Sequence, residues 1–146
     1  MRSVTASSLP AAVARLARLV AAVALFLGGC GGVAMAQAAP AKPDDKWRII
    51  CMHDTLSDGV VVFRLTPVGG QTQEIKVAIK AGTYENDVAR AIRDVFRATL
   101  PKELYHIETD DGEAVLVKRK KRDVPKFLLE FVTHNVNGLG IRVVLD

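Results

Sequence analysis

The fold is decided by residues 73–101, QEIKVAIKAGTYENDVARAIRDVFRATLP, which combine one strand pattern with one helix pattern. The first eight residues alternate apolar and polar or small side chains, as in a strand with one dry face. A helix is then expected between Thr83, a candidate N-cap, and Pro101, which cannot continue it. The apolar residues of that helix have the spacing of a single stripe: Val88, Ile92, Val95, Phe96 and Leu100.

Strand patterns flank this unit on both sides. They cover residues 47–53, 60–66, 105–109, 113–119, 126–133 and 141–145. The connections are short, and the pair Asp111-Gly112 is a strong hairpin signal, so antiparallel pairing is expected. The sequence therefore predicts an α+β domain with a single helix packed on a curved, mainly antiparallel sheet, in the order βββαββββ.

The predicted sheet carries more apolar surface than one helix can cover. A helix of about sixteen residues is roughly 24 Å long, and the first strand alone has Ile50 and Met52 opposite Trp47, Ile49 and Cys51. Either the sheet folds over on itself, or an apolar face or edge is left for a partner protein or a second copy of the chain.

Residues 1–36 are predicted to be a signal peptide. Three arginines and no acid accompany an apolar run at residues 19–27, which is too short to span about 30 Å of hydrocarbon. Ala34-Met35-Ala36 has the small-x-small form of a cleavage site. We expect residues 37–45 to be a flexible linker and residues 46–146 to be the single domain, exported to the periplasm or secreted, with no transmembrane segment in the mature form.

A second processing site would give a different mature protein. Leu27-Gly28-Gly29-Cys30 resembles the lipobox of bacterial lipoproteins, in which the cysteine is acylated and becomes the new N-terminus. In that alternative the chain is anchored to the membrane through Cys30, and the Gly-, Ala- and Pro-rich residues that follow act as a tether.

The charge of the mature chain is nearly balanced. The whole sequence has a formal net charge of +4, and removal of the three arginines in residues 1–36 leaves an excess of only one basic residue. Together with export, this balance argues against nucleic acid as the partner.

One cluster of positive charge stands apart from that balance. The five adjacent basic residues are Lys118, Arg119, Lys120, Lys121 and Arg122. Because adjacent like charges resist burial, we expect this run at the exposed end of a hairpin. It is either simply solvated or in contact with an acidic lipid head group, a polyanionic saccharide or an acidic patch on a protein.

The search for catalytic chemistry gives one weak candidate. Cys51 and His53 are two apart on a predicted strand, so their side chains would point the same way, about 6.5 Å apart, and could share a metal ion with His106 or His134. Cys51 also continues the apolar face of Trp47 and Ile49, which favours a buried thiol. No cofactor is expected.

These observations predict a small exported protein of a bacterial cell envelope. We expect a non-catalytic binding or structural module that engages another macromolecule through an apolar sheet face or edge and the basic hairpin. The alternative is a small envelope metal-binding protein or enzyme centred on Cys51 and His53.

Overall fold

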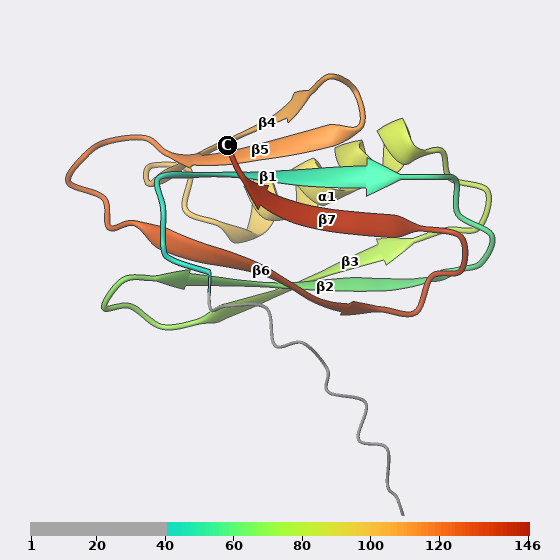
Figure 1. Cartoon of the computed structure of the whole chain (residues 1–146), viewed down its shortest axis with the longest axis horizontal. Helices are drawn as coiled ribbons and strands as arrows, with labels where there is room; N and C mark the ends of the chain where they lie inside the picture. Colours follow the sequence, from blue (N-terminus) through green and yellow to red (C-terminus); the bar gives the residue numbers. More distant parts are fainter. Residues whose placement is uncertain (1–40) are drawn as a thin grey trace, which may run out of the picture. The chain divides into compact units, whose positions relative to one another are not determined.

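The computed structural model of the chain describes residues 41–146 (Figure 1). The predicted signal peptide, Cys30 and the first part of the predicted linker lie outside the described residues. The elements are β1 (Lys46–Met52), β2 (Gly59–Pro67), β3 (Gln73–Ile79), α1 (Glu85–Thr99), β4 (Tyr105–Asp110), β5 (Ala114–Arg119), β6 (Phe127–His134) and β7 (Gly140–Leu145). The predicted α+β class and the order βββαββββ are confirmed.

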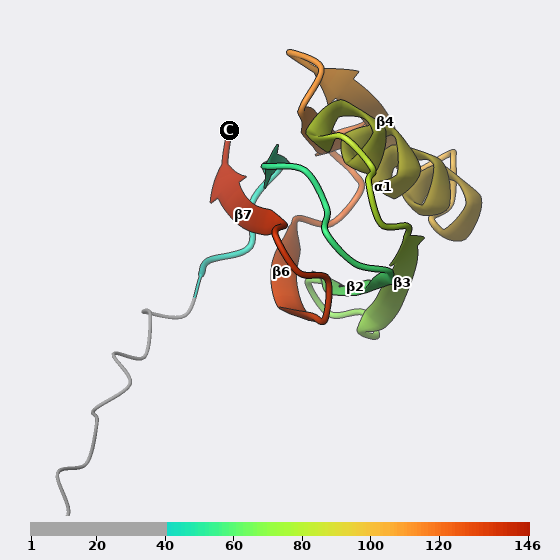
Figure 2. The ribbon, with the colours of Figure 1, turned by 90° about the vertical axis from the view of Figure 1, so that its right-hand side faces the viewer.

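The strands form two antiparallel sheets instead of one. The first has the order β4-β5-β1-β7 and the second the order β3-β2-β6. Helix α1 contacts β3 of the second sheet and β1, β4 and β5 of the first, so it bridges the two sheets along one side. Viewed end-on, the two sheets and α1 surround a common interior (Figure 2).

That interior contains the core and explains the excess of apolar strand residues. Trp47, Ile49 and Cys51 of β1 face the inside, as do Val61 and Phe63 of β2, and all five are buried. The four buried residues of α1 lie against them: Val88, Ala89, Ile92 and Phe96. The two sheets therefore cover each other's inner faces, which is the self-covering alternative of the sequence analysis.

The outer faces carry half-buried and exposed apolar side chains. Ile50 and Met52 are half-buried on β1. The large apolar side chains that are exposed belong to different loops and strands: Leu56, Val68, Tyr84, Leu104, Val132 and Leu145. No helix in residues 41–146 is both long and apolar enough to cross a membrane.

Two local predictions have different outcomes. The Asp-Gly hairpin is confirmed, since Asp111 and Gly112 connect β4 to β5 with φ values of 50° and 79°. The N-cap prediction is wrong, because α1 is capped at Tyr84 with no side-chain hydrogen bond. The hydroxyl of Thr83 instead donates to the carbonyl of Lys80 at 2.7 Å.

An isolated bridge lies just before β1. The amide of Asp44 donates to the carbonyl of Phe127 at 2.9 Å, and the amide of Phe127 donates back to Asp44 at 3.0 Å. The chain before β1 is thereby paired with the start of β6, while β1 itself lies in the other sheet.

Candidate functional site

The basic loop, residues 118–122, begins at the end of β5 and continues toward β6. β5 is paired on one side with β4 and on the other with β1, so it has no free edge for β6. The prediction that these residues form the end of a hairpin is therefore wrong, because this segment carries the chain from one sheet to the other (Figure 1).

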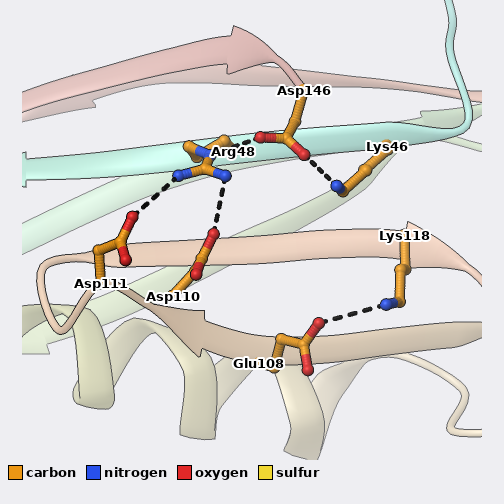
Figure 3. Close-up of polar contacts among 7 residues, drawn as sticks. All are labelled: Lys46, Arg48, Glu108, Asp110, Asp111, Lys118 and Asp146. Carbon is orange, nitrogen blue, oxygen red and sulfur yellow. Dashed lines mark hydrogen bonds and ion pairs between the residues drawn. The ribbon is translucent and has the colours of Figure 1, made fainter.

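Two of the five basic residues are held by acids and carbonyls of the domain. Lys118 Nζ lies 3.2 Å from Glu108 Oε1 of the neighbouring strand β4 (Figure 3). Arg119 Nη2 lies 2.9 Å from Asp45 Oδ1, and Nη1 donates to the carbonyl of Val124 at 2.6 Å. Arg119 thus closes the loop, and its charge is largely matched.

The other three basic residues are exposed. Lys120, Lys121 and Arg122 make no ion pair with any residue of the described part of the chain. Their backbone is nevertheless fixed, since the amide of Lys120 donates to the carbonyl of Leu104 at 2.8 Å and the amide of Val124 donates to Lys121 at 3.2 Å. The loop therefore presents three basic side chains without ion-pair partners on a hydrogen-bonded backbone, and one exposed acid, Asp123, directly follows them.

A groove lies beside these charges. It has a volume of about 260 Å³ and is lined by the basic loop together with Asp45 and Lys46. Its acid, Asp45, is already occupied by Arg119 at 2.9 Å and by Lys126 at 3.7 Å. A negatively charged group entering the groove would therefore meet an excess of positive charge.

The neighbouring outer face of the first sheet differs from the loop because most of its charged side chains are paired with one another (Figure 3), although Arg142 of β7 makes no ion pair within residues 41–146. Arg48 of β1 contacts Asp146 Oδ1 at 2.6 Å and Asp110 Oδ2 at 2.7 Å. Because β5 lies between β1 and β4, the Arg48 side chain crosses β5, where Leu116 is only 5% exposed. The hydrogen bond to Asp146 raises the pKa of Arg48, while Lys46 and then Arg48 lower the pKa of Asp146.

Glu108 completes this matched face. Its carboxylate lies 3.0 Å from His106 Nε2 and 3.2 Å from Lys118 Nζ. The hydrogen bonds from His106 and Lys118 lower the pKa of Glu108. The acids of the sheet face are thus paired with their own cations, and positive charge accumulates at the loop.

The structure separates Cys51 from His53. Cys51 is 1% exposed on the core side of β1, and burial raises the pKa of its thiol to about 12. β1 ends at Met52, and His53 is exposed with a φ of 66°, so the strand alternation on which the pair depended does not reach it. The buried-thiol interpretation is confirmed.

The two histidines proposed to complete a metal site lie elsewhere. His106 is on β4, and His134 ends β6. Residues 41–146 contain no group of three or more His, Cys, Asp or Glu side chains arranged to hold a metal ion. Nothing in the described geometry supports chemistry centred on Cys51 and His53.

Sequence reasoning missed a second hollow, of about 310 Å³, between the C-terminal end of α1 and β4. We call it the α1–β4 hollow. Arg97, Lys102 and Lys120 line it, and Lys120 also lines the groove of the basic loop. Lys120 is distant in the sequence from Arg97 and Lys102, and no local spacing indicates that it joins them.

The chain matches no family model and no curated protein sequence in comparisons with known proteins.

Proposed function

We propose that this chain is an exported, non-catalytic binding module of a bacterial cell envelope, and that its basic loop binds the acidic head groups of an envelope membrane. The single observation that carries this proposal is the loop itself. Lys120, Lys121 and Arg122 are exposed on an anchored backbone, with no ion pair inside residues 41–146. The predicted signal peptide at residues 1–36 supplies the location.

The surroundings of the loop favour a membrane surface over other anionic partners. Leu104 is a large exposed apolar residue, and its carbonyl accepts a hydrogen bond from the amide of Lys120 at 2.8 Å. An apolar side chain among lysines suits the boundary between lipid head groups and acyl chains. Each lysine or arginine close to an anionic bilayer contributes about 1 kcal/mol of binding free energy.

Vesicle sedimentation tests this proposal. The purified exported protein should pellet with vesicles that contain phosphatidylglycerol and remain in solution with pure phosphatidylcholine vesicles. The double variant Lys121→Ser/Arg122→Ser should bind about 30-fold more weakly at low salt, because it lacks two charges near the surface. About 0.5 M salt should weaken the binding of the native protein to these vesicles to a similar extent, since salt screens exposed charges.

A matched control variant removes two positive charges from the second sheet, β3-β2-β6. Arg64 and Lys76 lie on β2 and β3, are exposed, and both contact Glu74. The variant Arg64→Ser/Lys76→Ser should keep its vesicle affinity. Native affinity in the loop variant, or equal loss in both variants, would overturn the proposal. Binding to dextran sulfate without binding to vesicles would replace the lipid with a polyanionic saccharide.

A further inference from the structure

We propose that the α1–β4 hollow binds a single phosphate group that carries an apolar substituent, as in the head group and first carbons of an acidic lipid. The inference rests on the proposed function, because it names the group that the neighbouring basic loop would bring to this surface.

The rim of the hollow is cationic. Arg97 comes from the last turn of α1, Lys102 from the turn after it, and Lys120 from the loop after β5. No Asp or Glu lines the hollow. His106 also lines the hollow. Its side chain contacts Glu108, and the carboxylate of Glu108 contacts Lys118 as well. Three basic side chains from separate elements thus converge without a carboxylate between them.

Arg97 is held in place before any ligand arrives. Its Nε donates to the carbonyl of Ile107 at 2.8 Å. Its terminal nitrogens make no ion pair with any side chain of residues 41–146. A guanidinium fixed through Nε keeps its two outer nitrogens for the bidentate binding of a phosphate.

The edge of β4 adds a backbone donor. β4 is paired only with β5, so its other edge is free of strand partners. The Ile107 carbonyl points to that free edge, because it accepts from Arg97 of α1. In an antiparallel strand the amide and carbonyl of one residue lie on the same edge. The amide of Ile107 is therefore directed to the same side as the Arg97 guanidinium, where it can donate to an anion.

The floor of the hollow is apolar. Leu100, Tyr105 and Ile107 line it, and each is no more than 5% exposed. The small part of this floor that remains exposed would stay in contact with water beside a free phosphate, whereas an alkyl phosphate would cover it. The volume of about 310 Å³ is at the lower limit of small-molecule sites, so it suits a head group with a few carbons and excludes a whole lipid.

Hexyl phosphate is the probe for this site, and inorganic phosphate and hexanol are the two control ligands. Titration of the full exported protein with hexyl phosphate should shift the NMR signal of the Ile107 amide. The affinity should be about tenfold higher than for inorganic phosphate, which corresponds to the burial of about two methylene groups. Hexanol, which lacks the charge, should not bind measurably. Equal affinity for the two phosphates would overturn the apolar half of the inference.

Variants separate the hollow from the basic loop. Lys102→Ser alters an exposed turn residue and should weaken the binding of hexyl phosphate about tenfold, which is typical for the loss of one charged hydrogen bond. Arg97→Gln should have at least the same effect. Lys121→Ser/Arg122→Ser should leave this affinity unchanged, since neither residue lines the hollow. Unchanged affinity in both hollow variants would overturn the site.

The outcomes also separate this inference from the proposed function. Vesicle binding without any Ile107 response to hexyl phosphate would overturn the hollow and leave the loop proposal intact. An Ile107 response that is lost in Lys102→Ser, together with no vesicle binding, would overturn the lipid assignment. The hollow would then be a site for a soluble phosphate monoester.

Discussion

The thiol of Cys51 lies among the apolar residues between the two sheets. Burial is the largest cause of its raised pKa, followed by the negative charges of Glu113 and Glu85. A thiol must ionise before it can attack an electrophile or bind a metal. With a pKa of about 12, Cys51 is protonated in the folded protein at any physiological pH.

This shift makes a prediction for stability at alkaline pH. The unfolded chain loses the thiol proton near pH 9 and the folded chain near pH 12, so the contribution of Cys51 is complete below pH 9. Above pH 9 the free energy of unfolding should fall by at most about 1.4 kcal/mol per pH unit. Urea unfolding at pH 8, 9.5 and 10.5 measures it.

The control for this prediction is Cys51→Ala, which removes the titrating group and leaves every lysine and tyrosine in place. The difference in the free energy of unfolding between the native chain and Cys51→Ala should narrow as the pH rises from 9. A constant difference would show that the thiol ionises equally in both states.

The same scale shows why the five basic residues cannot be ranked from the sequence. Lys118 and Arg119 find acids on β4 and in the segment before β1, whereas Lys120, Lys121 and Arg122 find none in residues 41–146. All five are basic residues that are adjacent in the sequence, so the sequence does not distinguish them. They differ because the fold places Glu108 beside Lys118 and Asp45 beside Arg119.

At the level of elements, α1 has a strong apolar stripe but no side-chain N-cap. The helix dipole interacts favourably with Glu85 and Asp87 in the first turn and with Arg97 in the last turn. The N-cap, however, is Tyr84, whose φ of −70° and ψ of 153° suit a capping residue but whose side chain accepts no amide hydrogen. The amides of Asp87 and Val88 donate to the carbonyl of Tyr84, and no side chain caps the start of the helix.

We therefore predict that Tyr84→Asp stabilises the protein by about 1 kcal/mol. Aspartate can accept a hydrogen bond from the first turn, and its charge is favoured near the positive end of the helix. Tyr84 is 66% exposed, so little packing is lost. Thermal unfolding of Tyr84→Asp and of Tyr84→Ala measures the effect. If both variants shift the midpoint equally, the cap is not the limiting feature.

β3 and α1 could be predicted because burial repeats along them with the period of a strand and of a helix. In β3 the buried residues Ile75, Val77 and Ile79 occupy every second position, as the sequence pattern requires. Thr83 failed as the cap because its surroundings are not local. Its amide donates to the hydroxyl of Thr55 at 2.8 Å, and that hydroxyl in turn donates to Lys80, so a loop far away in the sequence determines its geometry.

At the level of the whole molecule, α1 packs against both sheets. The ring of Phe96 packs edge-to-face on Phe63 of β2, with centroids 5.4 Å apart, while α1 also contacts β1, β4 and β5 of the other sheet. Trp47 of β1 adds a direct link, because its Nε1 donates to the carbonyl of Phe127 on β6 at 2.8 Å. Neither sheet has a complete core without the other.

This arrangement predicts a single unfolding transition. Fluorescence of Trp47, the one tryptophan in the sequence, and far-UV circular dichroism should give coincident urea curves. Phe96→Ala should lower the free energy of unfolding by about 3–5 kcal/mol. Val95→Ala, at a half-buried position of the same helix, should cost clearly less. If Phe96→Ala proves unfolded, Phe96→Leu should give a smaller loss. Separate transitions for the two probes would contradict the shared core.

The class of the fold, the order of its elements and the inward faces of β3 and α1 follow from the sequence, because the periodicity of burial along these elements is a local property of the chain. The tertiary structure was needed to show that the strands divide into two sheets, that the basic loop connects one sheet to the other, and that Cys51 is buried while His53 is exposed. It also decided which charges are matched and where Arg97, Lys102 and Lys120 converge. These features depend on contacts between residues distant along the chain, and pairing of strand edges and charges across such distances leaves no periodic trace in the sequence.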